Sequence, residues 1–302
     1  MTTSGPYSIG IDGGGTKTDF ILVDSSGTIL AQRSTGGTNP SLHGQENVEI
    51  ILKQTCAQLI TDAGLSQGSI HKTLLCMAGP PKTWKAIAED LEGLGETISV
   101  DDSVPVVQLA VGNSAGLVLH AGTGSFVAAK DDKGTLHYAG GLGWRMGDAG
   151  SGLDLGRRGM TQAVLELQGW SDSTQLSSEL QKYMGITNLQ EIMEKIYVIS
   201  SEPNKLIGGF APIVVQLATG GLPEALYILK NSLKPILSLA QQVAQKLNLP
   251  STCRCGLSGR FLSSPLGVDL IKKALSSHSL KWDLVCVTEP PIEGIRQLLI
   301  TK

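Results

Sequence analysis

The sequence lacks the charge pattern of a protein that binds nucleic acid or an anionic membrane. Only 17% of its 302 residues are charged, the formal net charge is -3, and no run of Lys and Arg stands out. Such partners carry dense negative charge and are bound by basic patches. We therefore expect no nucleic acid and no membrane as partner, and a small molecule is the better candidate.

Long apolar runs are also absent. No stretch reaches the ~20 apolar residues of a membrane-spanning helix, and the opening MTTSGPYSIG has no basic segment followed by an apolar one, as a secretion signal would. These absences predict a cytoplasmic protein. With 302 residues, 41% of them hydrophobic, the chain is long and apolar enough for two globular domains.

Cysteine is scarce and unevenly spread, because none lies between Cys76 and Cys253. An odd, scattered set does not form a disulfide framework, and Cys253-x-Cys255 is a strand-like alternation rather than a zinc knuckle. We expect reduced thiols that fill hydrophobic cores. The five residues are Cys56, Cys76, Cys253, Cys255 and Cys286.

Glycine, by contrast, is abundant, and three glycines in a row mark the stretch IGIDGGGTKTDFILVD. An apolar strand over 7–11 leads into Asp12 and the glycines, and a second, β-branched strand follows over 18–24. Glycine has no Cβ, so such a turn lets backbone N–H groups approach a phosphate closely. Because the glycines join two strands rather than a strand and a helix, a P-loop and a Rossmann motif are excluded. A turn without a ligand is the alternative.

The opening pattern occurs twice, which indicates an internal duplication. Each copy begins with three short strands joined by tight turns that carry glycine and hydroxyl residues. These strands are expected at 7–11, 18–24 and 28–34, and again at 117–121, 126–130 and 135–138. After the first three, helical and strand patterns alternate, which predicts an α/β domain with added parallel strands. The expected helices cover 48–63, a segment ending at Leu94, and 104–111, and the expected strands cover 73–77 and 98–100.

Eight short motifs occur in the order of one known family. They are DGGGTKTD (12–19), TNP (38–40), MAG (77–79), the strand end VDD (100–102), AGTGS (121–125), GGLGWRMGDAGSG (140–152), LSGR (257–260) and EPPIEG (289–294). With these motifs the chain resembles the BadF/BadG/BcrA/BcrD ATPases, and in particular their N-acetylglucosamine kinase-like branch of the sugar kinase, Hsp70 and actin superfamily. Any single motif is weak evidence, but eight in order cover nearly the whole chain.

The resemblance implies an α/β fold of two ribonuclease H-like lobes, the duplicated actin-like ATPase fold, around an inter-lobe cleft. The N-terminal lobe would comprise residues 1–112, joined by a C-terminal helix over 292–302. The C-terminal lobe would comprise residues 113–291 and carry a helical insertion over 153–248, which matches no motif.

The resemblance also implies how ATP is bound. Asp12 would hold the hydration shell of Mg²⁺ beside the terminal phosphates, in preference to merely capping the turn. Phosphate contacts would come from Gly13, Gly14, Gly15 and Thr16 and from Gly122, Thr123, Gly124 and Ser125. Adenosine contacts would come from Ser258, Gly259, Arg260, Glu293 and Gly294. For Arg260, a solvated surface charge is the alternative.

Asp102 matches the family's catalytic aspartate, which accepts the proton of the sugar hydroxyl as the phosphoryl group is transferred. Asp101 is its competitor, because the two carboxylates are adjacent in sequence. Alternation along a strand would direct them to opposite faces. Counting back from AGTGS, we favour Asp102.

Sugar contacts are implied for Asn39, Gly143 and Asp148, besides Asp102. Short polar side chains on glycine-flanked loops suit a polyol, since each hydroxyl both donates and accepts. The alternative for Asn39 is a turn residue before Pro40. The alternative for Asp148 is a helix N-cap, a role that does not exclude sugar binding.

The resemblance favours an ATP-dependent kinase of the 6-hydroxyl of an amino sugar, most of all N-acetylglucosamine. The rival is an ATPase that activates a radical dehydratase or reductase, but that activator holds an iron–sulfur cluster on cysteines placed where this chain has none. A third alternative is an ATP-binding scaffold or sugar-sensing regulator. The choice of amino sugar, and whether the chain forms a homodimer, stay open.

Overall fold

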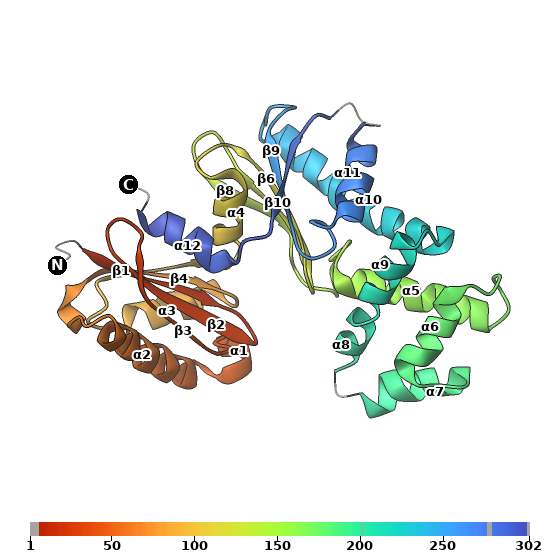
Figure 1. The fold of residues 1–302 in the computed structure, drawn as a ribbon, viewed down its shortest axis with the longest axis horizontal. Helices are drawn as coiled ribbons and strands as arrows, with labels where there is room; N and C mark the ends of the chain where they lie inside the picture. The colour runs from red at the N-terminus through yellow and green to blue at the C-terminus, as the bar shows by residue number, and fades with distance from the viewer. Residues whose placement is uncertain (1–5, 201, 277–279, 301–302) are drawn as a thin grey trace. The chain divides into compact units, whose positions relative to one another are not determined.

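The computed structural model describes residues 6–200, 202–276 and 280–300 (Figure 1). The chain divides into two compact units. Unit 1 comprises Met1–Gly112 together with Glu289–Lys302, and unit 2 comprises Asn113–Thr288. Each unit contains one five-stranded sheet.

The sheet of unit 1 is mixed. Its strands are β1 (Tyr7–Gly13), β2 (Lys17–Val23), β3 (Ile29–Gly36), β4 (Ile70–Met77) and β5 (Glu96–Asp101), in the order β3-β2-β1-β4-β5. The first three strands pair antiparallel, whereas β4 and β5 run parallel to β1. The carboxyl ends of β1, β4 and β5 therefore lie at the same edge of the sheet.

Helices cover both faces of this sheet. They are α1 (Pro40–His43), α2 (Gln45–Asp62), the short η1 (Gln67–Ser69), α3 (Pro81–Glu89), α4 (Val104–Val111) and α12 (Pro291–Ile300). Helices α2 and α3 cover one face (Figure 1). Alternating apolar residues such as Ile9, Ile11 and Phe20 pack with residues of these helices and are fully buried. Leu74 of β4 points to the opposite face and packs with Ile295 of α12.

One predicted helix is shorter than expected. The apolar spacing predicted a helix up to Leu94, but α3 ends at Glu89. Gly93 and Gly95 then adopt φ values of +76° and +70°, which a helix cannot continue through. Leu94 is nevertheless buried. It packs into the core from a turn rather than from a helix, so an apolar residue at this position did not require a helix.

Unit 2 repeats the same sheet. Its strands are β6 (Gly116–Ala121), β7 (Ser125–Lys130), β8 (Leu136–Gly140), β9 (Arg254–Ser258) and β10 (Asp283–Val287), in the order β10-β9-β6-β7-β8. β6, β7 and β8 pair antiparallel, and β9 and β10 extend the sheet in parallel. The predicted α/β fold with two similar sheets is confirmed.

The described part of segment 153–248 is helical, as predicted. The helices of unit 2 are α5 (Gly152–Leu167), α6 (Gln175–Met184), α7 (Leu189–Glu194), the π-helical η2 (Lys195–Ile199), α8 (Pro203–Gly208), α9 (Ala211–Thr219), α10 (Pro223–Lys246) and α11 (Pro265–Ser276). Large apolar residues such as Phe210 and Leu229 join these helices to the sheet in one core. The segment thus shares the core of unit 2.

Within the described residues, no single helix is long and apolar enough to cross a membrane. The segments Pro203–Thr219 and Pro223–Lys246 meet the criteria of length and composition only as a pair, bent by 119°. Their apolar residues pack in the core of unit 2.

All five cysteines are free thiols. Four are buried, as expected for thiols that fill cores. The expectation is wrong for Cys286, which is exposed, because β10 lies at the edge of its sheet.

Candidate functional site

The first glycine turn is a tight hairpin between β1 and β2. The Gly14 N–H donates to the Lys17 carbonyl at 2.9 Å, and the Thr38 N–H donates to the Gly14 carbonyl at 3.0 Å. The next loop approaches so closely that a Cβ at Gly37 would lie 2.1 Å from the Gly15 carbonyl oxygen. Packing from this loop therefore holds the turn in a defined shape.

Acidic side chains gather at the carboxyl edge of the unit 1 sheet, beside this turn. Asp12 on β1 lies directly opposite Asp19 on β2, and Asp102 follows the end of β5. Loss of hydration on burial, followed by the charges of Asp19 and Asp102, raises the pKa of Asp12 to about 6, although Lys17 opposes the shift. Lys17 also forms a 2.8 Å ion pair with Asp19. Concentrated negative charge of this kind attracts a cation.

Asp101 and Asp102 have different surroundings. Asp101 Oδ1 accepts hydrogen bonds from the Ser103 N–H, at 3.0 Å, and from the Ser103 hydroxyl, so this carboxylate fixes the start of α4. The Asp102 side chain stays open to solvent, yet neighbouring protein atoms displace part of its hydration. This loss, with the Asp101 charge and a side-chain hydrogen bond to Asp101, raises the pKa of Asp102 to about 6.

Asn39 lies near the same edge. Its Oδ1 accepts a hydrogen bond from the Ser41 N–H at 3.0 Å and so caps α1. A Cβ at Gly79 would lie 3.1 Å from that oxygen, so the loop after β4 reaches Asn39. Beside this loop is a small cavity of about 60 Å³ between the ends of β4 and β5. Its lining residues are Met77, Gly79, Pro81, Trp84, Ser99, Val100 and Asp101.

The second glycine turn joins β6 and β7 of unit 2. The Gly122 N–H donates to the Gly124 carbonyl at 2.9 Å, and the Gly152 N–H donates to the Gly122 carbonyl at 2.8 Å. The Ser125 hydroxyl donates to the Ala149 carbonyl at 2.8 Å. The turn of predicted phosphate residues is therefore tied to the loop that carries Asp148.

Asp148 is held in an unfavourable state. Its φ of +67° is rare for a residue other than glycine, and its Oδ1 is buried with no hydrogen-bond partner among the described residues. A Cβ at Gly124 would lie 2.9 Å from its Oδ2. The N-cap alternative is wrong, because Ser151 caps α5 by accepting a hydrogen bond from the Asp154 N–H at 3.2 Å. Backbone strain and an unsatisfied buried oxygen together are typical of a residue that binds a ligand.

The third predicted turn lies against the second one. Gly259 has φ of +103°, and a Cβ there would lie 2.0 Å from the Ala121 carbonyl oxygen. Ser258 Oγ lies 3.1 Å from His120 Nδ1, and the His120 ring stacks on Phe126 at a centroid distance of 4.7 Å. Burial lowers the pKa of His120. Unit 2 thus brings the second phosphate turn, Asp148 and Ser258–Gly259 together, whereas Arg260 is exposed.

The other two predicted adenosine residues belong to α12 of unit 1. A Cβ at Gly294 would lie 2.3 Å from the Pro105 carbonyl oxygen, so glycine allows α12 to pack on α4. Glu293 forms a 2.7 Å ion pair with Arg296, which also donates to the Gly27 carbonyl. Both residues have structural roles in unit 1, and their contact with adenosine stays a prediction.

The glycine-rich loop before Asp148 is open to solvent. Gly143 has φ of +86°, and its carbonyl accepts a hydrogen bond from the Met146 N–H at 3.0 Å. Leu142, Trp144 and Met146 are exposed by 77%, 47% and 75%. The Arg145 guanidinium lies 5.3 Å from the centroid of the Trp144 ring.

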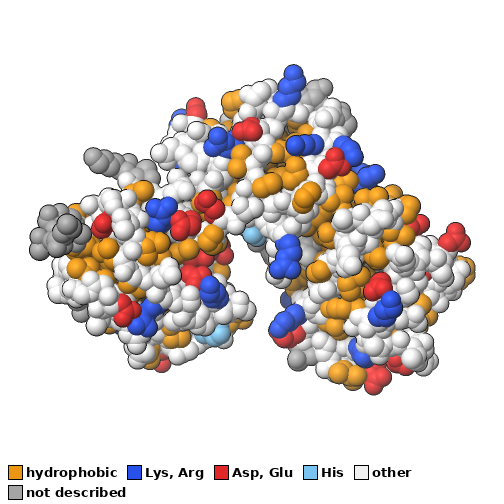
Figure 2. Space-filling model, viewed as in Figure 1, with side chains coloured by type: hydrophobic (Ala, Val, Ile, Leu, Met, Phe, Trp, Pro, Cys, Tyr) orange, Lys and Arg blue, Asp and Glu red, His pale blue; other side chains and the backbone are white. Residues whose placement is uncertain are grey.

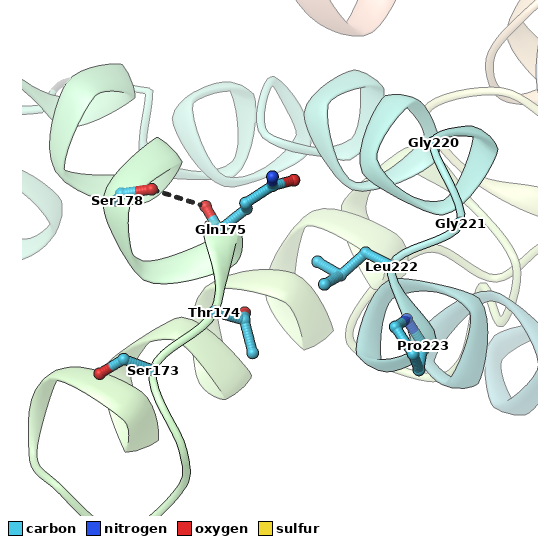
Figure 3. A pocket seen from close by; sticks show the side chains of 8 residues that line it. All are labelled: Ser173, Thr174, Gln175, Ser178, Gly220, Gly221, Leu222 and Pro223. Atoms are coloured by element: carbon cyan, nitrogen blue, oxygen red, sulfur yellow. Dashed lines mark hydrogen bonds between the residues drawn. The ribbon is translucent and has the colours of Figure 1, made fainter.

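None of the predicted site residues lines the larger of the two cavities that we describe. It encloses about 600 Å³, is broadly open to solvent, and lies between the start of α6 and the turn that joins α9 to α10 (Figure 3). Its lining residues are Ser173, Thr174, Gln175, Ser178, Gly220, Gly221, Leu222 and Pro223. Buried Glu166 already accepts hydrogen bonds from the Thr174 N–H and hydroxyl, so a second anion would be repelled.

Three features of the site were not assigned from the sequence. The meeting of Asp12 with Asp19 depends on the register of the hairpin. His120 precedes the second turn and showed no motif of its own, and Lys17 was seen only as part of a glycine-hydroxyl turn.

Within the described residues, no group of three or more His, Cys, Asp or Glu side chains could hold a metal ion by itself. On the face shown in Figure 2, Lys and Arg lie interspersed with Asp and Glu.

The sequence matches the BadF/BadG/BcrA/BcrD ATPase family over residues 9–293. It is 25% identical to the N-acetylmuramic acid/N-acetylglucosamine kinase of Clostridium acetobutylicum, over 80% of this chain and 81% of that protein. It is also 25% identical to the N-acetyl-D-glucosamine kinase of Dictyostelium discoideum, over 97% of this chain and 98% of that protein. A crystal structure from Chromobacterium violaceum has the same fold, with a TM-score of 0.71, 23% identity, and coverage of 98% of this chain and 99% of that one.

Proposed function

Because the chain belongs to the BadF/BadG/BcrA/BcrD ATPase family, we propose that it is an ATP-dependent kinase of an amino sugar. It would transfer the γ-phosphoryl group to the 6-hydroxyl, with N-acetylglucosamine as the first candidate substrate. Both curated relatives are named as kinases of this sugar, and the similarity extends over most of the chain in each case. A kinase that consumes ATP would work in the cytoplasm.

The observation that carries the proposal is the difference in surroundings between Asp101 and Asp102. Asp101 is committed to Ser103, whereas Asp102 has a solvent-accessible carboxylate whose pKa is raised to about 6. A base with such a pKa is ionised at neutral pH and is a better proton acceptor than an ordinary carboxylate. Asp102 would orient the sugar hydroxyl and take its proton as the phosphoryl group arrives.

The two glycine turns would bind the phosphates. The Gly14 and Gly122 N–H groups and the Ser125 hydroxyl hold the turns in shape. The other backbone N–H groups and hydroxyls at 13–16 and 122–125 are neutral donors, which suit an anion. Asp12 fits Mg²⁺ because the negative charges of Asp19 and Asp102 act on its half-buried carboxylate. These side chains do not form a complete set of metal ligands by themselves. Mg²⁺ often keeps several waters and binds one or two carboxylates together with substrate phosphates. When bound with ATP, it would neutralise charge on the phosphates.

Asn39, Gly143 and Asp148 would bind the sugar. The unsatisfied Oδ1 of Asp148 needs a donor, and a sugar hydroxyl supplies one. Asn39 already uses Oδ1 as a helix cap, which fixes the side chain for a second contact. Ser258, Gly259 and Arg260, with Glu293 and Gly294, stay the proposed adenosine contacts.

A coupled assay of ATP turnover tests the proposal. The acceptors are glucose, glucosamine, N-acetylglucosamine and N-acetylmuramic acid, each with Mg²⁺ and with EDTA. We expect turnover that requires both Mg²⁺ and an N-acetylated amino sugar, and a product phosphorylated at position 6. Sugar-independent ATP hydrolysis alone, or turnover with none of the four sugars, would contradict the proposal.

A further inference from the structure

Asp154, in the first turn of α5, is a buried acid that uses both oxygens of its carboxylate. It is exposed by only 3%. Its Oδ1 accepts hydrogen bonds from Arg157 and Arg158, at 3.0 and 2.9 Å. Its Oδ2 accepts one from the Ser232 hydroxyl, at 2.5 Å, and one from the Gly150 N–H, at 3.2 Å. Burying a charge is costly unless it is paired and hydrogen-bonded. Here arginines pair with one oxygen, and the other oxygen binds a loop.

Gly150 belongs to the turn that carries Asp148. The Ser151 N–H donates to the Asp148 carbonyl at 3.1 Å and closes this turn, in which Gly150 has a φ of +82°. The Gly150 N–H lies 3.1 Å from Ser232 Oγ as well as 3.2 Å from Asp154 Oδ2. Asp154 of α5 and Ser232 of α10 therefore fix the backbone two residues after Asp148.

The conformation of Asp148 requires such support. Its φ of +67° is unfavourable for a residue with a side chain, and a strained backbone persists only where its surroundings hold it. The Ser125 hydroxyl of the second phosphate turn binds the next carbonyl, that of Ala149, at 2.8 Å. The Asp154 carboxylate and the Ser232 hydroxyl bind the N–H of the residue after it. These bonds hold Asp148, whose buried Oδ1 has no partner among the described residues.

We propose that Asp154 is a positioning residue of the sugar site, which acts through Gly150 to hold the Asp148 carboxylate in the orientation that receives a sugar hydroxyl. Asp154 itself does not touch the sugar. Ser232 orients the Asp154 carboxylate, so α10 of the helical segment contributes to sugar binding. A buried ion pair that served stability alone would leave the affinity for the sugar unchanged. The inference rests on the proposed kinase function and on the sugar contact of Asp148.

A double-mutant cycle between Asp154 and Asp148 tests the inference. Asp154→Asn keeps the size of the side chain but removes the charge that binds Gly150. It should raise the KM for N-acetylglucosamine by about tenfold or more, with a much smaller change in the KM for ATP. Asp148→Asn should raise the same KM, and asparagine tolerates a positive φ. In the Asp148→Asn background, Asp154→Asn should change the KM for the sugar by less than about twofold, because the residue through which it acts is already lost.

Glu166→Gln is the matched control. Glu166 lies on the same helix and is also exposed by 3%, but it accepts hydrogen bonds from Thr174 and Ser177 at the start of α6. Its substitution also removes a buried charge, so it should lower the free energy of unfolding, as Asp154→Asn does. The KM for the sugar should nevertheless stay within about twofold of wild type. An equal rise of this KM in Glu166→Gln would show a general effect of lost stability, and the inference would be wrong.

Ser232→Ala is a milder variant that keeps the Asp154 charge, and it replaces Asp154→Asn in the cycle if that variant does not fold. It should raise the KM for the sugar in the wild-type background and not in the Asp148→Asn background. If the KM rises by the same factor in both backgrounds, or in neither, the inference is wrong while the kinase function stands. If the wild type phosphorylates none of the four sugars, the kinase function itself fails, and the inference fails with it.

Discussion

At the scale of single residues, the proposed site contains two adjacent carboxylates with different partners. Asp101 accepts two hydrogen bonds from Ser103, and Asp102 makes no such cap. We expect Asp102→Asn to lower kcat by about 10²–10⁴-fold with little change in the KM for the sugar. The amide can still accept a hydrogen bond from the hydroxyl but cannot take its proton. Steady-state kinetics with N-acetylglucosamine measures both constants.

Asp101→Asn is the control for this variant. The amide oxygen can still accept from Ser103, so the start of α4 should be kept, and kcat should stay within a few-fold of wild type. If Asp101→Asn lost activity while Asp102→Asn kept a near-normal kcat, Asp101 and not Asp102 would be the proton acceptor. Normal kcat in both variants would refute the base mechanism.

The raised pKa of Asp102 predicts the acid limb of the pH profile. The active form is the carboxylate, and its pKa is raised from 3.8 to about 6. Activity should therefore be complete above pH 7 and should fall as the pH is lowered through about 6. The profile should be measured at saturating Mg²⁺ and ATP, because the Mg²⁺ that we propose beside Asp12 would keep this second carboxylate, whose pKa is also raised to about 6, ionised.

Asp101→Asn makes this pH prediction specific. The Asp101 charge is the largest cause of the shift after loss of hydration, so its removal should move the acid limb of kcat towards lower pH. A limb that stays in place in Asp101→Asn would show that Asp102 is not the titrating base. A limb near pH 4 in wild type would show that the pKa of Asp102 is not raised.

At the scale of elements, the glycine turns show what the sequence could and could not predict. Their place between two strands followed from the β-branched residues after Gly15, and the structure has hairpins at both turns. The pairing of Asp12 with Asp19 could not be predicted, because it depends on a register that only the folded sheet fixes. The burial of Asp148 Oδ1 was likewise inaccessible, since it results from packing between distant segments.

The sequence alone also could not decide between Asp101 and Asp102. Strand alternation separates the two side chains, but only the folded chain shows which of them reaches Ser103. Cys286 was expected in a core and is exposed at a sheet edge, because the apolar pattern of β10 does not tell an edge strand from a central one.

Contact between the first turn and the following loop predicts a steric effect. In Gly37→Ala the new Cβ would lie 2.1 Å from the Gly15 carbonyl oxygen, so the loop must move away from the turn. We expect a loss of about 1–3 kcal/mol in the free energy of unfolding, which is usual for overpacking, and a raised KM for ATP. Chemical denaturation and ATP titration measure the two effects.

Gly36→Ala is the matched control, because a Cβ at Gly36 would meet no atom within 4 Å. It should change the free energy of unfolding by less than about 1 kcal/mol and leave the KM for ATP unchanged. Equal effects of the two substitutions would mean that the close approach at Gly37 does not shape the turn.

At the scale of the whole molecule, the duplication decides what the chain can do. Each unit has the same order of five strands and places a glycine turn after its first strand. The units differ after their third strand, because unit 2 alone inserts the helices from α5 to α10 before its fourth strand. A kinase and an electron-transferring activator can both be built on such a frame, so cysteine placement must distinguish them.

Iron content distinguishes these two classes. A four-iron cluster shared by two subunits needs about four thiolates that reach a common surface. Here burial raises the pKa of Cys56, Cys76, Cys253 and Cys255, so these thiols resist ionisation, and only Cys286 is exposed. Two copies of Cys286 would supply two ligands.

We therefore expect protein purified without oxygen to be colourless, to hold no stoichiometric iron, and to keep its kinase activity in Cys286→Ser. A brown protein with about four irons per dimer, lost together with activity in Cys286→Ser, would instead place the chain among the activators.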